Sequence, residues 1–438
     1  MVNVAPFKGI TYNKEKISDL DTVMSPPYDI ISQKEQNRLY KNNPYNFVRL
    51  ILGKQYPEDN TENNRYTRAG TDFKNWQKEQ ILVSSEKSAI YPYKVTYTVD
   101  NTKRTMSGFF VLLKIDNKYE QVKAHEQTLS KPKADRLDLL RACYANLEPI
   151  QLLYIDENDT INTLIQERVA KEALIDVKGY DGFNHAIWKI TNDQVIKKIQ
   201  ELLKNEILFI ADGHHRYQTA INYAREMEEK TGNTNPNAPF QYRMVILVNM
   251  FDEGLAILPT HRLIHLPKNV SKERLRTDLE HYFSVETFPA DKTIDADKRI
   301  AEIKKQLETS SDHKFAIVFN DEYSIITLKD ESIMNKIAKN KSETWRTLDV
   351  SILHKIVVEK IMGISQDTLE DHVKYTREDR EAIQVVDNEE FDCSILMNAT
   401  KIDELKAIAD AGEHMPQKST YFLPKMLSGL VMYDMSKQ

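Results

Sequence analysis

An apolar run that ends in a polar turn and continues into an amphipathic segment is the strongest constraint in this sequence. Residues 207–211 are all apolar, and Asp212 and Gly213 follow them directly. Apolar side chains then recur at helical spacing, at Tyr217, Ala220, Ile221, Ala224 and Met227. We therefore predict a buried strand over 207–211 and a helix that begins near residue 214.

The residues between this strand and this helix are suited to binding an anion. A helix start presents backbone N–H groups and the positive end of the helix dipole. Gly213 allows a tight backbone, Arg216 offers a planar guanidinium group, and Asp212 is able to hold a divalent cation. We predict metal binding at Asp212 and phosphate-donor binding at Gly213, His214, His215 and Arg216. An N-cap followed by a surface loop is the alternative.

The composition is that of an ordinary globular protein. Of 438 residues, 41% are hydrophobic and 29% are charged, so the chain is long enough for two or three domains. The net charge of −6 disfavours nucleic-acid binding by phosphate neutralisation. Cys143 and Cys393 are too few for a disulfide framework, and no apolar run approaches the roughly 18 residues of a membrane span. We expect a cytoplasmic protein that binds neither nucleic acid nor a membrane.

Short strands and amphipathic helices alternate along the chain without a repeating unit, which predicts an α+β fold. Residues 89–99 and 104–115 alternate in polarity and are predicted to form a β-hairpin. The expected segments are an N-terminal α/β region over 1–117, a catalytic core over 118–265 with an insertion over 156–206, and a C-terminal α+β module over 266–438.

A carboxylate that follows an apolar stretch is our candidate for the general base of a phosphoryl transfer. Transfer to a hydroxyl needs positive charge around the phosphoryl oxygens and usually a group that takes the hydroxyl proton. Glu126, with His125 beside it, precedes a polar loop that contains Lys131. We predict a catalytic role for Glu126, His125 and Asp212 and a donor contact for Lys131. Solvated surface side chains are the alternative.

Two more groups of polar residues are candidates for ligand contacts. Residues 418–420 are predicted donor contacts, and they lie in a loop that also holds Lys425: Lys418, Ser419 and Thr420. Residues 260–262 are predicted substrate contacts at the end of a strand: Thr260, His261 and Arg262. A solvated loop and a buried, hydrogen-bonded histidine are the respective alternatives. Because no glycine-rich phosphate loop is present, the turn at 212–216 is the main candidate for the phosphate site.

The order of these motifs resembles that of free-serine kinases, which belong to the ParB/sulfiredoxin-like superfamily. The matching positions are His125, Glu126, Arg136, Leu140, Pro149, Ile150 and 212–216. The resemblance implies a ParB/sulfiredoxin-like core in which Glu126 deprotonates the serine hydroxyl, while Asp212 and the turn at 214–216 bind donor phosphates and Mg²⁺. The turn has no cysteine, which disfavours the sulfinic-acid reduction of sulfiredoxin.

The whole sequence is also similar to a widespread bacterial family catalogued as a domain of unknown function. Its motifs lie at 25–29, 44–46, 125–128, 211–217, 259–262 and 415–422. Members of that family have been linked to pyrophosphate-dependent phosphorylation of free L-serine. The resemblance therefore implies a phosphotransferase that makes O-phospho-L-serine from L-serine and pyrophosphate with Mg²⁺. The alternatives are a kinase for another small hydroxyl compound that uses ATP or ADP, and a non-catalytic nucleotide- or phosphate-binding protein.

Overall fold

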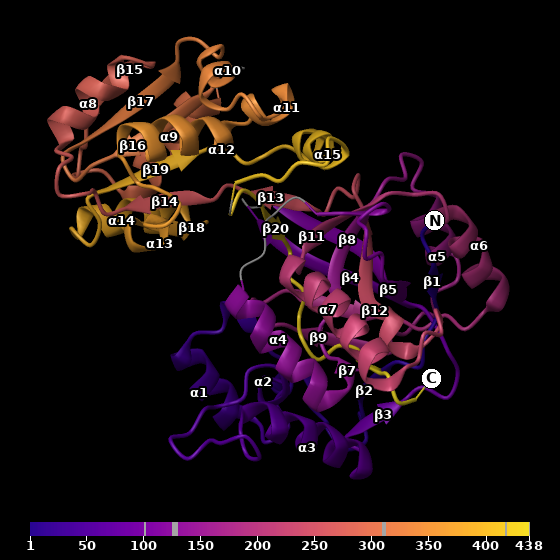
Figure 1. Cartoon of the computed structure of the whole chain (residues 1–438). Helices are drawn as coiled ribbons and strands as arrows, with labels where there is room; N and C mark the ends of the chain where they lie inside the picture. The colour runs from indigo at the N-terminus through magenta and orange to yellow at the C-terminus, as the bar shows by residue number, and fades with distance from the viewer. Residues whose placement is uncertain (100–101, 125–129, 309–311, 417, 438) are drawn as a thin grey trace. The chain divides into compact units, whose positions relative to one another are not determined.

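The computed structural model describes residues 1–438 except 100–101, 125–129, 309–311, 417 and 438, and only the backbone of residues 130–132. The chain divides into two compact units (Figure 1). Unit 1 takes in 1–124, 128–256 and 424–438, whereas unit 2 takes in 257–423. The three segments expected from the sequence group the same elements differently, and that division stays a prediction.

Unit 1 is built on a large sheet flanked by helices. Its strands are β1 (Val4–Ala5), β2 (Ile10–Tyr12), β3 (Leu82–Ser84), β4 (Tyr91–Val99), β5 (Thr102–Lys114), β6 (Val122–Lys123), β7 (Ala145–Asn146), β8 (Ile150–Tyr154), β9 (Ile175–Lys178), β10 (Asn184–Ile187), β11 (Leu208–Asp212), β12 (Tyr242–Asn249) and β21 (Tyr433–Asp434). Its helices are η1 (Leu20–Thr22), η2 (Tyr28–Ile30), α1 (Gln33–Asn42), α2 (Val48–Ile51), α3 (Arg65–Lys78), α4 (Ser130–Cys143), α5 (Thr160–Gln166), α6 (Asp193–Leu203), α7 (His214–Thr231) and η3 (Pro239–Gln241).

The main sheet of unit 1 places the end of β11 close to one sheet edge. Among the described residues the strand order is β6-β11-β8-β12-β5-β4-β10-β9, with β1 beside β5. β11 is antiparallel to β8, and β12 runs parallel to β8 on its other side. Within the part of the chain that the structure describes, only the two-residue strand β6 lies beyond β11. Asp212, the polar residue that ends β11, therefore lies close to one edge of the sheet.

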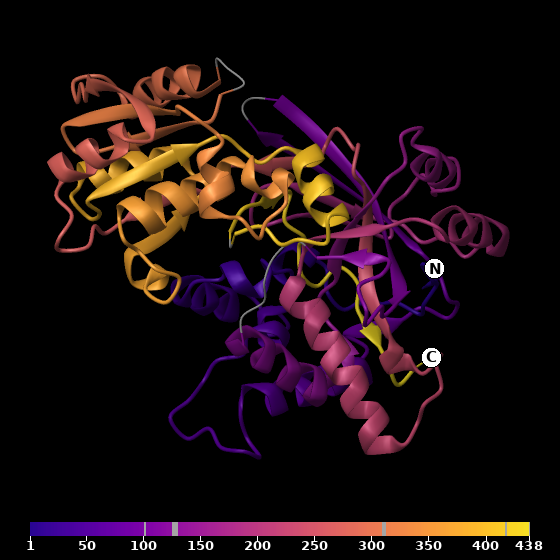
Figure 2. The same cartoon turned by 45° about the horizontal axis from the view of Figure 1, so that its top comes forward.

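Alternate residues of the central strands form the core of this unit. They pack with side chains of α5, α6 and α7 in one buried cluster, which includes Val111, Leu152, Ile210, Val245, Ile199, Tyr217 and Ile221. Burying each large apolar side chain of this kind stabilises the fold by about 1.5–3 kcal/mol. Figure 2 shows α7 along its length. The side chains that alternate along the strands and those on the apolar face of α7 therefore pack in the same core.

Several expectations about unit 1 are confirmed. β4 and β5 pair antiparallel as the predicted hairpin, from Tyr91 opposite Phe110 to Val99 opposite Thr102. The predicted strand over 207–211 is β11, and the predicted helix is α7. Two strands of the segment over 156–206 extend the sheet, because β10 pairs with β4 and β9 pairs with β10; that this segment is an insertion stays a prediction.

Unit 2 contains a second sheet with helices on both faces. Its strands, from the boundary onward, are β13 (Ala256–Leu258), β14 (His261–Ile264), β15 (Phe283–Pro289), β16 (Lys314–Val318), β17 (Glu322–Leu328), β18 (Val373–Thr376), β19 (Cys393–Met397) and β20 (Tyr421–Leu423). Its helices are α8 (Lys272–Glu280), α9 (Ala296–Glu308), α10 (Ile333–Ile337), α11 (Glu343–Arg346), α12 (Asp349–Ile352), η4 (Leu353–Ile361, a π-helix), α13 (Leu369–His372), α14 (Asp379–Asp387) and α15 (Ile402–Asp410).

The sheet of unit 2 has the order β15-β17-β16-β19-β14-β18 among the described residues, and neighbouring strands in it are antiparallel. Both faces are apolar, because neighbouring residues enter different clusters. Ile264 packs with α8 and η4, whereas Leu263 packs with α9 and α14. Residues 260–262 follow the end of β13, as expected, but His261 and Arg262 already belong to the next strand, β14, because residues 261–264 pair with β18.

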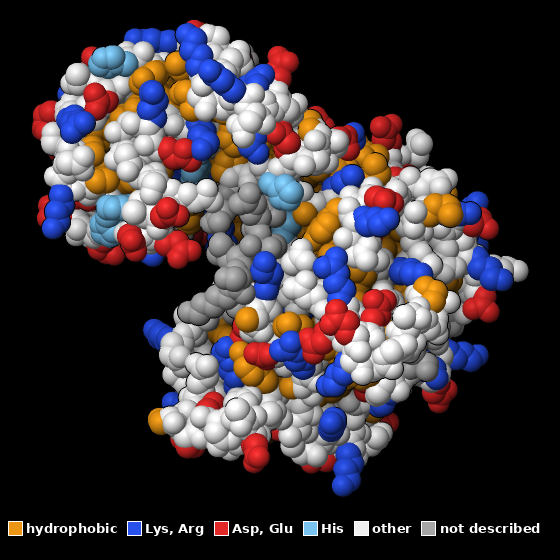
Figure 3. Space-filling model, viewed as in Figure 1, with side chains coloured by type: hydrophobic (Ala, Val, Ile, Leu, Met, Phe, Trp, Pro, Cys, Tyr) orange, Lys and Arg blue, Asp and Glu red, His pale blue; other side chains and the backbone are white. Residues whose placement is uncertain are grey.

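The α+β class expected from the sequence is confirmed. In the described part of the chain, no helix is both long and apolar enough to cross a membrane. On the face shown in Figure 3, Lys and Arg side chains are interspersed with Asp and Glu side chains, in keeping with the small net charge of −6.

Candidate functional site

The turn between β11 and α7 depends on a glycine. Gly213 has a φ of +97° and occupies the N-cap position of α7. This is the left-handed region, which side chains other than that of glycine enter only with strain. A Cβ atom on Gly213 would also lie 2.9 Å from Nε of Arg216. Glycine is therefore required both by the backbone and by the close approach of the arginine.

Asp212 is held between two cations. Its Oδ2 accepts a hydrogen bond from Nη2 of Arg216, and its Oδ1 accepts one from Nζ of Lys425, which lies 213 residues later in the chain. Burial alone would raise the pKa of Asp212, but the charges of Lys425 and Arg216 outweigh burial and hold that pKa well below its ordinary value. Asp212 is consequently ionised at neutral pH, and it fixes both cations at the start of α7.

Arg216 connects this turn to the neighbouring strand. Its Nη1 donates to the carbonyl oxygen of Pro149, directly before β8, at 2.5 Å. Its Nε is buried and has no hydrogen-bond partner among the described residues. His214 is also buried, and its charge contributes to lowering the pKa of Asp212. The first turn of α7 therefore concentrates positive charge where the helix dipole is already positive.

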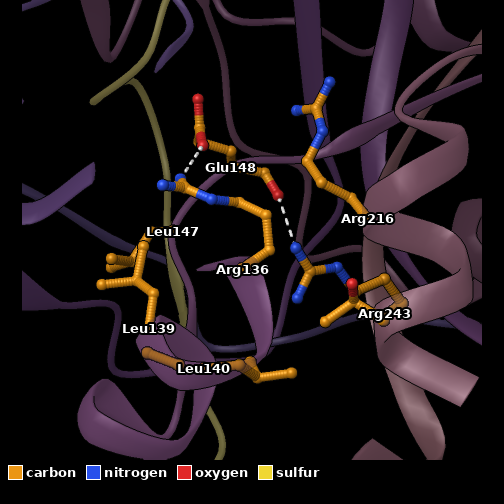
Figure 4. A pocket seen from close by; sticks show the side chains of 9 residues that line it. Arg136, Leu139, Leu140, Leu147, Glu148, Arg216 and Arg243 are labelled. Atoms are coloured by element: carbon orange, nitrogen blue, oxygen red, sulfur yellow. Dashed lines mark hydrogen bonds and ion pairs between the residues drawn. The ribbon is translucent and has the colours of Figure 1, made fainter. Parts of the chain in front are cut away.

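A small cavity of about 30 Å³ lies beside this turn within unit 1. Its charged lining consists of three arginines and one glutamate: Arg136, Arg216, Arg243 and Glu148. Figure 4 shows Arg136 and Arg243 approaching Glu148, with leucine side chains along one wall. This volume is enough for about one water molecule.

Glu148 is the buried acceptor of this cavity. Its carboxylate accepts hydrogen bonds from Oγ of Ser428 at 3.0 Å and from Nη1 of Arg136 at 3.4 Å, while its carbonyl oxygen accepts one from Nη2 of Arg243 at 3.1 Å. Burial lowers the pKa of Arg243 to about 9, and the charge of Arg216 acts in the same direction. The cavity is thus rich in positive charge, and Arg216 belongs to both the cavity and the turn.

The residues at the turn do not fit a magnesium ion. Magnesium is held by carboxylates, water and substrate phosphates, and each carboxylate must offer it an oxygen. Both oxygens of Asp212 face cations instead. Across the described residues, no three His, Cys, Asp or Glu side chains gather as a metal cluster. We therefore derive no step through a metal at Asp212, and its predicted role as a ligand stays a prediction.

The structure brings only part of the predicted donor site together. Asp212, Gly213, His214, His215 and Arg216 are adjacent at the turn in unit 1, and Lys425 joins them. His125 and Glu126 lie outside the described residues, and for Lys131 only the backbone is described. Their predicted roles stay predictions.

The predicted cluster at 418–420 belongs to unit 2, whereas Lys425 belongs to unit 1. Lys418 is exposed and has a φ of +56°. Ser419 is buried; its Oγ donates to the carbonyl oxygen of Pro416, and its own carbonyl oxygen accepts from Oγ1 of Thr400. Thr420 is half-buried. The structure gives Ser419 a loop-stabilising contact, and the donor role of the three residues stays a prediction.

The predicted substrate residues at 260–262 are all buried in unit 2. Nε2 of His261 hydrogen-bonds Oδ1 of Asp379 at 2.7 Å, which is the buried, hydrogen-bonded histidine of the alternative interpretation. Arg262 is 0% exposed. A substrate contact by Thr260, His261 or Arg262 stays a prediction.

Sequence reasoning missed two buried charges of the cavity, although both leave a local signal. Glu148 lies between Leu147 and Pro149, and Arg243 is the only charged residue in β12. A single charge within an apolar segment indicates a buried polar contact. The fold brings the two residues together, and Nη2 of Arg243 donates to the carbonyl oxygen of Glu148.

A family model described as "Protein of unknown function (DUF1015)" matches residues 4–351. The chain belongs to the DUF1015 family. This confirms the resemblance to a family catalogued as a domain of unknown function. The match contains the whole turn at 212–216 and extends into unit 2 as far as α12. No curated protein matches the sequence.

Solved structures show slight likeness to this DUF1015 protein. A free serine kinase variant in complex with ADP has a TM-score of 0.36 and 12% identity, over 73% of this chain and 88% of that chain. A conserved hypothetical protein from Pyrococcus furiosus has a TM-score of 0.33 and 14% identity, over 72% and 90%. SbnI from Staphylococcus aureus, truncated at its C-terminus, has a TM-score of 0.35 and 10% identity, over 71% of this chain and 83% of that chain. Likeness at this level carries no functional argument.

Proposed function

We propose that this protein transfers a phosphoryl group from pyrophosphate to the hydroxyl of free L-serine and so forms O-phospho-L-serine. One observation carries the proposal: the turn at 212–216 gathers Arg216, Lys425 and the N-terminus of α7 around a single carboxylate. Membership of the DUF1015 family supports it, because the sequence resembles a family linked to this reaction.

The donor side of the reaction is derived from the turn. Pyrophosphate carries several negative charges, and Arg216, Lys425 and the start of α7 would neutralise them. Asp212 would act as a positioning residue, since it holds both cations in place before the donor arrives. A donor oxygen would also satisfy the buried Nε of Arg216. Magnesium belongs to the proposal only as an expected cofactor of the donor.

The acceptor side rests on residues that the sequence predicts. Oγ of L-serine would attack one phosphorus atom of pyrophosphate, the bridging P–O bond would break, and orthophosphate would leave. Glu126, with His125 beside it, would take the proton from the serine hydroxyl. Contacts with the acceptor at Thr260, His261 and Arg262, and with the donor at Lys131 and 418–420, are part of the same proposal.

Phosphorus NMR tests this function directly. The full chain is incubated with Mg²⁺ and L-serine, and with pyrophosphate, ATP or ADP as the donor; the expected result is O-phospho-L-serine and orthophosphate from pyrophosphate. If a phosphoester formed only from another hydroxyl compound, that compound would replace L-serine as the proposed acceptor. If it formed only with ATP or ADP, that nucleotide would replace pyrophosphate as the proposed donor. Donor binding without any product would indicate a phosphate-binding protein instead.

Two lysine variants test whether pyrophosphate binds at the turn. Lys425→Met removes one of the two cations at Asp212, and we expect it to weaken pyrophosphate binding by about tenfold in calorimetry. Lys437→Met removes the same charge from an exposed position of the same unit and should leave the affinity unchanged. Equal affinities for the two variants would remove Lys425 from the donor site.

A further inference from the structure

Unit 2 contains a buried arginine without an acidic partner. Arg262 is fully enclosed, and burial lowers its pKa only to about 10, so it is a cation at neutral pH. Its Nη1 donates to the carbonyl oxygen of Thr260 and lies 2.8 Å from Sδ of Met397. No described carboxylate forms an ion pair with it, and its Nε has no partner among the described residues. A buried charge without a counterion is strongly unfavourable, and the ring of Tyr375, whose centre lies 5.6 Å from Cζ of Arg262, compensates only part of it.

The guanidinium of Arg262 fixes the state of a neighbouring histidine. Nη2 of Arg262 lies 3.4 Å from Nε2 of His354, the second residue of the π-helix η4. A guanidinium group only donates, so Nε2 is the acceptor and the ring proton is on Nδ1. Burial, together with Arg262 and Lys355, lowers the pKa of His354 to about 3, so the ring is neutral. His354 therefore has an N–H group to donate to a further partner.

His354 also lines a pocket of about 160 Å³ that lies entirely within unit 2. A cavity of about 150 Å³ is large enough for benzene. Its apolar lining includes Trp345, Ile364, Leu369 and Met415, so the walls suit an apolar group of that size. π-Helical turns such as η4 are rare and are frequent at functional sites.

The polar lining of this pocket is positive. Lys355 is neutralised by Glu359, with Nζ and Oε2 2.6 Å apart. Nζ of Lys341 lies 5.2 Å from the centre of the Trp345 ring, and the nearest carboxylate that pairs with it, that of Glu413, is 3.9 Å away. Lys341 is therefore the cation of the lining that retains most of its charge for a ligand, and Arg262 adds a second positive charge behind His354.

We propose that this pocket binds a small carboxylate whose apolar body is about the size of a benzene ring. The apolar body packs against Trp345, and the carboxylate accepts hydrogen bonds from Nδ1 of His354 and Nζ of Lys341. Arg262 supplies the compensating charge through His354. This site goes beyond the phosphoryl transfer proposed above and does not rest on it, because the residues that would touch the carboxylate, His354 and Lys341, are not part of that proposal. Arg262, which is also proposed above as an acceptor contact, supplies only charge here and does not touch the ligand.

Benzoate is the probe for this site in the full chain. Trp345 lines the pocket, so binding is followed by tryptophan fluorescence and by calorimetry. Benzyl alcohol, a neutral compound of similar size, should bind at least about tenfold more weakly, since it forms no charge-assisted hydrogen bond. Equal affinities for the two compounds would overturn the proposal. Tighter binding of phenyl phosphate than of benzoate would replace the carboxylate by a phosphate ester.

Variants separate a specific site from general attraction by charge. Lys341→Met should weaken benzoate binding by roughly threefold, and His354→Leu by about tenfold. Lys339→Met removes the same charge from a neighbouring exposed position and should change nothing. Lys341 is partly exposed, so its variant is expected to fold even where that of buried His354 does not. Unchanged affinity in Lys341→Met would contradict the assigned contact.

Discussion

At the scale of single residues, the chemistry of the candidate site depends on which charges meet Asp212. Burial by itself would favour a neutral carboxyl group, and the sequence alone therefore leaves its charge open. Lys425 and Arg216 decide the balance and keep the pKa of Asp212 low. The same contacts withdraw Asp212 from a metal ion. A residue predicted as a metal ligand is, in this structure, the counterion of two cations.

Asp212→Asn should destabilise unit 1 by about 3 kcal/mol, because it leaves two buried cations without their partner. The folded-state pKa of Asp212 is depressed, so its stabilisation is present above the unfolded value of about 3.9 and is lost as the pH falls below it. Urea unfolding at pH 7 and at pH 3 measures both effects. The parent chain should lose more stability than the variant between these values; parallel losses would exclude Asp212 as the titrating group.

Glu126→Gln should lower kcat by a factor of about 10²–10⁴, because an amide does not take the serine proton. Pyrophosphate binding should be unchanged, since the donor contacts lie at the turn. Rapid-quench measurement of phosphoserine gives the rate, and calorimetry gives the donor affinity. Near-normal kcat in this variant would remove Glu126 from the mechanism, whatever the donor affinity.

At the scale of elements, local periodicity was sufficient. The strand over 207–211 was predicted from a continuous apolar run, the helix that follows it from helical spacing, and the hairpin of β4 and β5 from alternating polarity. The strand β14 was not predicted, since it begins with the polar residues His261 and Arg262, which are buried. Buried polar residues whose partners come from elsewhere in the fold leave no periodic pattern of polarity in the sequence.

Gly213→Ala should cost about 1–3 kcal/mol and should also weaken donor binding, because the added Cβ is strained at a φ of +97° and displaces Arg216. Gly232→Ala at the other end of α7 is the matched control. Its φ is +65°, and no atom lies within 4 Å of the added Cβ. Thermal unfolding compares the stabilities of the two variants, and calorimetry compares their affinities for pyrophosphate. Equal donor affinity in the two variants would show that the turn needs glycine for folding alone.

At the scale of the whole molecule, the chain leaves unit 1 after residue 256 and returns to it at residue 424. The returning segment supplies Lys425 to Asp212 and Ser428 to Glu148, and β21 pairs with β7. The family match covers 4–351, so this segment lies beyond it. Unit 1 is therefore completed by the last residues of the chain.

Truncation after Leu423 should destabilise unit 1 and leave unit 2 folded. Trp76 and Trp188 lie in unit 1, whereas Trp345 lies in unit 2, so denaturation followed by fluorescence in single-tryptophan variants reports on each unit. The transition of unit 1 should move to lower urea, and that of unit 2 should not move. A common shift of both transitions would show that the units unfold as one.

The sequence by itself determined the α+β class, the family, the strand and helix around the turn, and the residue types that suit an anion there. Those properties depend on neighbours within a few positions, where periodicity and turn chemistry act. Only the tertiary structure decided that Lys425 reaches Asp212, that Glu148 meets Arg136 and Ser428, and that Arg262 is enclosed beside His354. These contacts join residues separated by up to 280 positions, and packing of the whole chain selects them.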